Sequence, residues 1–183
     1  MLEKIREIVK KEAEEEDWKY HIVPVVEYAK KLAKILKVDE EIVELAALLH
    51  DIGRLKNVDN ENHHLTGAVE AEKILKEHNY PEPVIEEVKH CIESHRGSED
   101  IAPRTIIAKI IANADAMAHF DAVPRLIYWR CQEGKGFEET LNWLYDKIER
   151  DWNKKLTLPE ARKLVESKYK AIKLVLDSNK EYI

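Results

Sequence analysis

The sequence predicts an all-α protein, a single-domain bundle of about eight or nine helices. The chain has 183 residues, which is the size of one domain with a substantial core. Apolar residues recur at helical spacing along most of it, and no segment alternates between apolar and polar residues as a half-buried strand would. Five glycines and six prolines are few enough to leave long helices uninterrupted.

The first half is expected to contain five helices, separated by capping residues, prolines or polar loops. Pro24 fits the first turn of the second helix. Asp39 is a good N-cap for the third helix, which Gly53 would end. The polar segment "NVDNEN" predicts a loop before the fourth helix. The five helices are expected at about Leu2–Glu16, from Tyr20 onward, Asp39–Gly53, Asn62–His78 and Pro83–His95.

The second half is expected to contain four more helical segments. The stretch "RGSEDIAP" would end the fifth helix, and Pro124 would interrupt the sixth and restart it. The glycine-containing stretch "EGKGF" predicts a turn before the last two helices. These four segments are expected at about Pro103–Phe120, Pro124–Gln132, Phe137–Trp152 and Pro159–Ser178.

Composition narrows the class of protein. The net charge of −6 argues against stable, non-specific nucleic-acid binding. The charged N-terminus lacks the apolar region of a signal peptide, and no apolar run is long enough for a membrane span, so a cytoplasmic protein is expected. Cys91 and Cys131 form no CxxC pair and are expected to be reduced, partly buried thiols. The many Lys and Glu residues, with Gln132 as the only glutamine, give a thermophile-like composition.

Four polar residues occupy positions where their helices carry apolar residues: His21, His50, Asp51 and Asp115. In "LAALLHDIGR" a fully apolar run leads straight into His50 and Asp51, and in "IIANADAMAHF" Asp115 shares a face with Ile111. A buried carboxylate is costly unless it is paired. Two imidazoles and two carboxylates could satisfy one another around a divalent cation. The alternative is that each residue is a hydrogen-bonded polar side chain of the core, or a helix cap.

The order of these residues resembles the HD-domain metal-dependent phosphohydrolase superfamily, in its small stand-alone members. The segments that carry the resemblance are "HIVPVVEYAKKLAKIL", "ELAALLHDIGR", "HLTGAVEAEKIL", "VKHCIESH" and "IIANADAM". They span about residues 18–125, which would form the core of one HD-type domain covering residues 1–183. The resemblance implies that His21, His50, Asp51 and Asp115 bind one divalent metal ion. The helices of residues 126–183 would cap the cleft or form a dimer element.

His64 and His95 have three interpretations. Both share faces with apolar residues and are expected near the cleft. In dinuclear members of the superfamily, histidines at similar places bind a second metal ion. Alternatively, the two could contact the substrate phosphate or act as acid and base, or they could simply pack in the core. His90 is expected at the surface rather than at the edge of the cleft. Surface or supporting positions are expected for His63, His78 and His119.

Positive and aromatic side chains suggest how a substrate would be held. Arg54 and Lys56 follow the His-Asp pair and would suit a phosphate group, although basic residues also complement a helix C-terminus. An aromatic group could stack on a nucleobase, but such residues more often form a core or a dimer face. Its members are Tyr128, Trp129, Trp143, Tyr145 and Trp152.

The resemblance therefore implies a metal-dependent phosphohydrolase that cleaves a phosphate ester or phosphoanhydride of a nucleotide or other small phosphorylated metabolite with metal-activated water. Asp51, Arg54, His64 and His95 are the expected catalytic residues. The ligands would suit Mn, Fe, Co, Ni, Zn or Mg and do not fix the metal. The family resemblance implies a homodimer, and we expect no association with a membrane. Two alternatives remain: a non-catalytic metal- or nucleotide-binding regulatory module, and a di-iron oxygenase with a second metal ion at His64 and His95.

Overall fold

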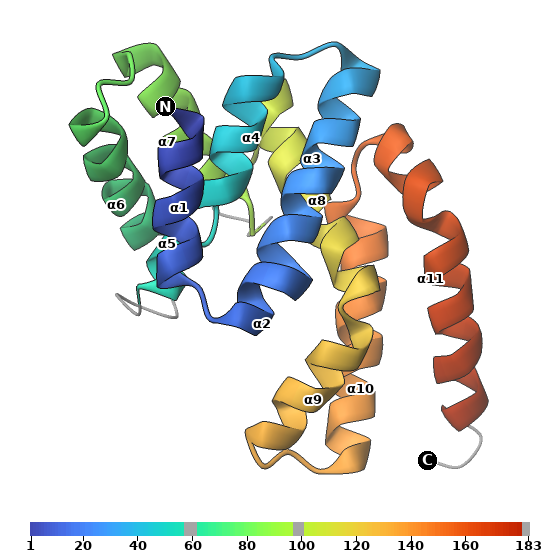
Figure 1. Cartoon of the computed structure of the whole chain (residues 1–183). Helices are drawn as coiled ribbons and strands as arrows, with labels where there is room; N and C mark the ends of the chain where they lie inside the picture. The colour runs from blue at the N-terminus through green and yellow to red at the C-terminus, as the bar shows by residue number, and fades with distance from the viewer. Residues whose placement is uncertain (57–61, 97–100, 181–183) are drawn as a thin grey trace.

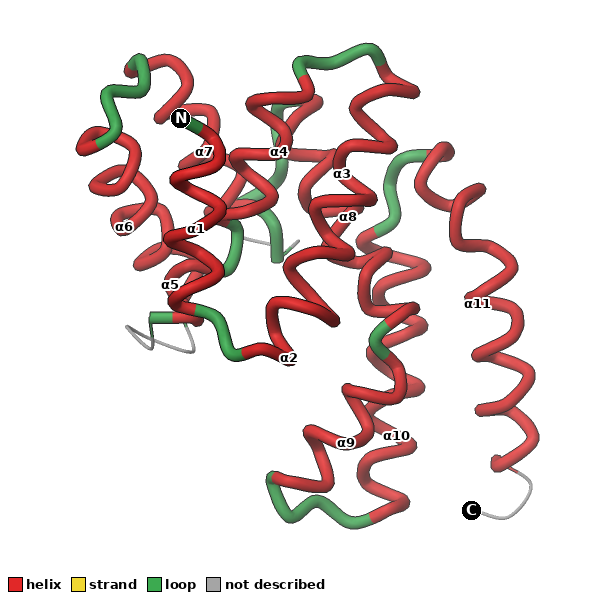
Figure 2. Tube along the Cα trace, in the orientation of Figure 1, coloured by secondary structure: helices red, strands yellow, loops and turns green. Residues whose placement is uncertain are grey.

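Helices account for all the regular structure in residues 1–56, 62–96 and 101–180, which are the residues that the computed structural model describes (Figure 1, Figure 2). Nine of these helices have ten or more residues, so the prediction of a single all-α domain is confirmed. The long helices are α1 (Leu2–Glu12), α3 (Val23–Leu36), α4 (Glu40–Leu49), α6 (His63–Glu77), α7 (Glu82–Ser94), α8 (Ile106–Asp121), α9 (Val123–Gln132), α10 (Phe137–Arg150) and α11 (Pro159–Lys180).

The beginning of the chain differs from the prediction. The first helix ends at Glu12 rather than Glu16, because Ala13 adopts an extended conformation with φ −83° and ψ 139°. Helical structure then resumes at α2 (Glu15–Asp17), continues through the wider π-helical turn η1 (Trp18–Ile22) and runs on into α3. Pro24 follows η1 and has no backbone N–H to donate to the preceding turn, which accounts for the change in helical spacing there.

A second difference lies where the sequence predicted one helix from Asp39 to Gly53. Asp39 caps α4 as expected, with its Oδ1 accepting from the backbone N–H groups of Glu41 and Ile42 at 2.9 and 3.2 Å. The helix ends at Leu49, because Asp51 leaves the helical region with φ −108° and ψ 13°. A single turn, α5 (Ile52–Leu55), then follows in a new direction.

The turn after α4 lies in backbone contact with α6 through two glycines. A Cβ placed on Gly53 would lie 2.4 Å from the carbonyl oxygen of His63 and 2.7 Å from the backbone nitrogen of Gly67. Only a glycine therefore allows α5 and α6 to approach this closely. This contact fixes the start of α6 beside the residues that follow α4.

The alanine-rich helix α8 lies at the centre of the bundle. It packs against α3, α4, α7 and α11, and eleven of its residues are buried (Figure 1). Small side chains let the neighbouring helices approach closely, which suits a helix with neighbours on several sides. α9 and α10 pack against each other as an antiparallel pair, and the π-helical turn η2 (Asp151–Lys155) after α10 returns the chain to α8.

Other boundaries lie within three residues of their predicted positions, and the last two residues of the helix predicted to end at Trp152 belong to η2. The loops expected in "NVDNEN" and "RGSEDIAP" fall mainly on residues 57–61 and 97–100, outside the described residues.

The aromatic residues of the C-terminal half lie in different surroundings. Trp152 stacks on Tyr169 with ring centroids 4.2 Å apart, whereas Tyr128 and Trp129 are exposed. Within the described residues, none of the helices combines the length and apolar character that a membrane span requires.

Candidate metal centre

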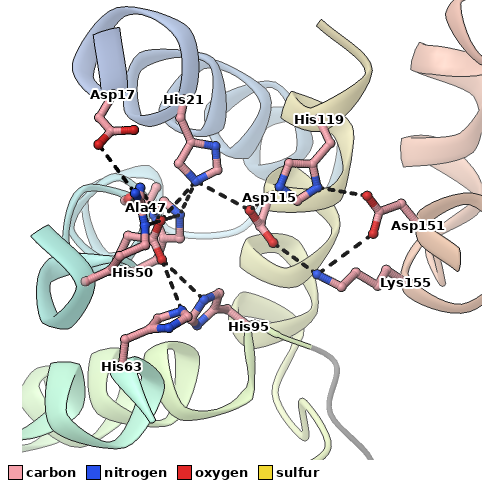
Figure 3. Close-up of polar contacts among 12 residues, drawn as sticks. Asp17, His21, Ala47, His50, His63, His95, Asp115, His119, Asp151 and Lys155 are labelled. Carbon is pink, nitrogen blue, oxygen red and sulfur yellow. Dashed lines mark hydrogen bonds and ion pairs between the residues drawn. The ribbon is translucent and has the colours of Figure 1, made fainter. Parts of the chain in front are cut away.

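The four predicted ligands are buried in the interior of the bundle, and Figure 3 shows His21, His50 and Asp115 pointing toward one another. The π-helical turn η1 supplies His21, the end of α4 supplies His50 and Asp51, and α8 supplies Asp115. His21 Nε2 lies 3.1 Å from both His50 Nε2 and Asp51 Oδ2, and 3.6 Å from Asp115 Oδ1. All four residues are at least 93% buried. The turn at Asp51 allows two adjacent residues of the sequence to face the same point.

Backbone contacts fix the orientation of His50. Its Nδ1 donates to the carbonyl oxygen of Ala47 at 2.8 Å, which leaves the lone pair of Nε2 directed toward His21 and Asp51. Complete burial lowers the pKa of His50 to about 4, because the charged imidazolium would lose its hydration. The imidazole is therefore neutral at pH 7 and can donate its lone pair to a metal ion.

Both carboxylates of the centre are ionised. Burial alone would raise the pKa of Asp51, but the Arg54 guanidinium beside it outweighs burial and holds that pKa well below its usual range. Burial would also raise the pKa of Asp115, but the nearby ammonium group of Lys155 helps to hold that pKa well below its usual range. Negative charge is thus fixed at the point where the imidazole lone pairs meet.

The spacing of these atoms suits one divalent cation. Nitrogen and oxygen ligands lie about 2.1 Å from such an ion, so neighbouring ligands around it are about 3.0–3.4 Å apart. The separations from His21 to His50 and Asp51, both 3.1 Å, lie within that range. Without a cation or a proton between them, acceptor atoms this close would repel one another. The residues present therefore fit a bound metal ion.

The second oxygen of Asp51 faces a further pair of histidines. Asp51 Oδ1 lies 3.4 Å from His63 Nε2 and 3.6 Å from His95 Nε2, and the three residues could share an ion. His95 Nδ1 donates to the carbonyl oxygen of Ile92 at 2.6 Å, which directs the Nε2 lone pair toward Asp51. Within the part of the chain that the structure describes, the histidine grouped with Asp51 and His95 is His63 and not the predicted His64. His64 Nδ1 lies 3.5 Å from Arg96 Nη1. His63 was expected at the surface or in a supporting position.

The C-terminal part of the chain contributes residues that the sequence did not reveal. His119 lies one turn after Asp115 on α8, with Nε2 3.5 Å from Asp115 Oδ1. From η2, Lys155 Nζ lies 3.3 Å from Asp115 Oδ2, and Asp151 accepts from His119 Nδ1 at 2.9 Å. The spacing of four between Asp115 and His119 was a signal that could have been used, because such residues share a helix face. No local pattern marked Asp151 and Lys155.

The two predicted phosphate-binding residues are paired with carboxylates. Arg54 donates through Nε to Asp51 Oδ2 at 2.9 Å and lies 3.4 Å from Asp17 Oδ2, so it also orients a predicted metal ligand. Arg125 contacts the other oxygen of Asp17. Lys56 Nζ lies 3.0 Å from Glu70 Oε2 on α6.

Two expectations about other side chains need correction. His90, expected more at the surface than at the cleft edge, is 91% buried, and its Nε2 accepts the backbone N–H of Arg104. His119, expected at the surface or in a supporting position, takes the second of these places, with a side chain 12% exposed and Nε2 3.5 Å from Asp115 Oδ1. Cys131 is exposed rather than partly buried, whereas Cys91 is completely buried, and both thiols are free.

Comparison with curated proteins finds relatives that match a little over half of the chain. A tRNA (cytidine(56)-2'-O)-methyltransferase from Picrophilus torridus is 31% identical over an alignment of 120 residues, which covers 58% of this chain and 33% of that protein. Ribonuclease Y from Geobacillus thermodenitrificans is 38% identical over 98 residues, which are 54% of this chain and 17% of that protein. The matched segment thus spans a third or less of these relatives.

Solved structures share the fold over almost the whole chain. A predicted HD superfamily hydrolase from an uncultured Thermotogales bacterium has a TM-score of 0.63 and 25% identity, with 99% of this chain and 92% of that chain covered. Bacillus subtilis YpgQ in complex with ADP has a TM-score of 0.77 and 21% identity, with 98% and 94% covered. Residues 18–119, more than half of the chain, match the HD domain family. The resemblance seen in the sequence is confirmed, and the chain belongs to the HD domain family.

Proposed function

We propose that this protein is a metal-dependent phosphohydrolase that cleaves a phosphate ester or phosphoanhydride of a nucleotide or another small phosphorylated metabolite. The observation that carries the proposal is the buried arrangement around His21, whose Nε2 lies 3.1 Å from both His50 Nε2 and Asp51 Oδ2 and 3.6 Å from Asp115 Oδ1. Membership of the HD domain family supports the reaction class. The shared fold with an ADP complex of YpgQ supports a nucleotide.

The four residues would hold an ion of Mn, Fe, Co, Ni, Zn or Mg. When bound, such an ion lowers the pKa of a water molecule toward neutrality and polarises a phosphoryl oxygen. Asp51, ionised at pH 7 and oriented by Arg54, would accept a hydrogen bond from the attacking water and so direct it. The carboxylate keeps this role at neutral pH because Arg54 is permanently charged.

Positive charge from the protein would stabilise the phosphoryl group during attack. Arg54 is the first candidate, because its guanidinium is about one third exposed and already lies beside Asp51. Lys56 would provide a second cation once its pairing with Glu70 is exchanged for phosphate. His64 or His95 would protonate the leaving oxygen.

One observation favours a second metal ion, which the alternative function of a di-iron oxygenase would require. Asp51 presents Oδ2 to His21 and His50 and Oδ1 to His63 and His95, the arrangement expected of a carboxylate that bridges two ions. A di-iron oxygenase on this scaffold would use the same bridge. Two irons per chain, oxygen consumption and no phosphate release would replace the phosphohydrolase proposal with this one.

The first test combines elemental analysis with a phosphate-release screen. The screen would include nucleoside mono-, di- and triphosphates, each with Mn, Mg, Co, Ni and Zn. Asp51→Asn is expected to lower both metal content and kcat/KM by more than about 100-fold, because even a partner of a metal ligand is worth about 10- to 100-fold. The matched control is Asp146→Asn, an exposed residue of α10 that should leave both unchanged.

Each outcome decides something different. Metal binding and turnover in the unaltered protein, both lost in Asp51→Asn, would support the proposal and identify the substrate class. Nucleotide binding without turnover at any metal would favour a regulatory module instead. Full activity in a metal-depleted Asp51→Asn protein would contradict the mechanism.

A further inference from the structure

His119 completes a third group of potential ligand atoms, which lies on the C-terminal side of the centre (Figure 3). Its Nε2 is 3.5 Å from Asp115 Oδ1, and the same oxygen is 3.6 Å from His21 Nε2. The ligand atoms of these three residues all lie within 4.8 Å of one another. We propose that His119 is a further ligand of the metal ion held by His21 and Asp115, and that Asp151 is its positioning residue.

The hydrogen bond between His119 and Asp151 sets the state of the ring. Asp151 Oδ2 lies 2.9 Å from His119 Nδ1 and, as an ionised carboxylate, can only accept, so the ring proton is on Nδ1. Nε2 then presents a lone pair to the oxygen of Asp115. Two acceptors 3.5 Å apart repel unless a cation lies between them. A carboxylate that holds the far nitrogen of a histidine is the arrangement that proteins use to orient metal-bound imidazoles.

Two lysines balance the charge of the carboxylates on this side. Lys147 Nζ lies 3.4 Å from Asp151 Oδ2, and Lys155 Nζ lies 3.3 Å from Asp115 Oδ2. The buried carboxylates are therefore compensated without a charge on His119. Lys147 Nζ also lies 3.1 Å from His119 Nδ1 and 3.4 Å from Nε2, and an ion bound at Nε2 would replace the second of these contacts.

This proposal rests on the metal binding in the proposed function and not on the substrate, so it can be tested without turnover. The metal-free protein would be titrated with Co²⁺, with visible absorption and calorimetry as readouts, because the absorption of Co²⁺ reports its ligands. The variants are His119→Gln, which removes the ligand, and Asp151→Asn, which removes the acceptor that orients it. The control is His78→Gln. His78 Nδ1 also forms a hydrogen bond, to the carbonyl oxygen of Ile74, but His78 lies at the C-terminal end of α6, whereas the centre is beside His63 at the start of that helix.

We expect His119→Gln to shift the Co²⁺ absorption bands and to weaken Co²⁺ binding by more than 10-fold. Asp151→Asn should weaken binding about 10- to 100-fold with the bands retained. An unchanged spectrum and affinity in His119→Gln would overturn the proposal, even if activity fell, because His119 would then act on the substrate. If the unaltered protein bound no Co²⁺, Zn²⁺ or Mn²⁺, the proposed function would fail as well.

Discussion

His50 makes the stability of the metal-free protein depend on pH. Burial lowers its pKa to about 4 in the folded state, whereas the unfolded chain has the ordinary value near 6.5. Between these values the unfolded chain binds a proton that the folded chain does not, so the free energy of unfolding falls as the pH falls from 6.5 to 4. Asp51 and Asp115, with lowered pKa values, extend the loss to lower pH.

The expected loss from His50 is up to about 3 kcal/mol. Urea unfolding in the presence of a chelator, at pH 7 and at pH 4.5, would measure it. His50→Asn should unfold more easily at pH 7 and show a shallower dependence between the two pH values. Equal pH dependence in the variant and the unaltered protein would show that another group titrates in this window.

The two cysteines should react very differently with a thiol reagent. Burial and the nearby Glu87 raise the pKa of Cys91 well above its usual range, and the side chain is completely inaccessible. Cys131 is exposed on α9. Because the thiolate is the reactive species, one thiol per chain should react with an aromatic disulfide reagent at pH 8, and the second only after denaturation. Cys131→Ser should abolish the fast reaction, and any rapid residual reaction would contradict the burial of Cys91.

Sequence reasoning placed the four central residues correctly in the interior, and their role as ligands stays a prediction. It succeeded because a polar residue on an apolar helix face must find a partner in the core. It did not find Asp151 and Lys155, since their partners lie more than 30 residues away and the pairing depends on how α10 returns to α8. His63 and His64 are adjacent, so the uncertainty between them came from the rotation of α6 rather than from the residue type.

At the scale of elements, the contact between α5 and α6 supports the centre. Gly53→Ala would place a methyl group against backbone atoms of His63 and Gly67, which cannot move aside as a flexible side chain would. We expect a loss of about 1–3 kcal/mol in the free energy of unfolding. Metal affinity should fall too, because Gly53 lies only two residues after Asp51 and the shift would displace His63.

The control for this substitution is Gly136→Ala at the start of α10. A Cβ there meets no atom within 4 Å, and φ is −67°, so the change should cost less than about 1 kcal/mol. Chemical denaturation of both variants, with calorimetric titration of metal, would compare them. Equal stability of the two variants would show that α5 and α6 can separate without loss.

The helices themselves were largely predictable from periodicity and caps, but two of the breaks were not. Ala13 and Asp51 leave helical geometry without a glycine or proline at the break. The helix from Asp39 to Gly53 would have continued on local propensity, since "LAALL" is strongly helix-forming. Tertiary contacts of His50 and Asp51 at the centre, together with the close approach of α6, outweigh that propensity.

At the scale of the whole molecule, a metal ion would link segments that are far apart in the sequence. His21, His50 and Asp115 come from η1, α4 and α8, so an ion that binds only the folded chain stabilises it. With free metal at about 100 times Kd, the gain is about 2.7 kcal/mol. For a domain of this size that corresponds to a rise in Tm of about 5–10 °C.

Thermal unfolding with and without a chelator would measure this rise. Asp115→Asn should lower Tm in the absence of metal and remove most of the increase on metal addition. An identical increase in the variant would show that metal acts elsewhere on the protein. Exposed Asp146→Asn again provides the matched control.

The all-α class could be predicted for the whole chain and the family from about residues 18–125, whereas the place of the C-terminal helices could not be predicted. The family match ends at residue 119, and the segments beyond it carry no motif of the family. Their position follows from packing: α11 contacts α8 and α3, and α10 contacts α9 and η2.

The contacts of Asp115 with Lys155 and of His119 with Asp151 have a consequence for biosynthesis. The N-terminal ligands emerge from the ribosome first, but the residues that hold Asp115 and His119 are translated some 30 to 40 positions after them. A nascent chain that has reached only residue 120 would carry the proposed metal ligands without Asp151 and Lys155, which contact His119 and Asp115. If these residues bind a metal ion as proposed, the complete site would form only after translation has passed η2.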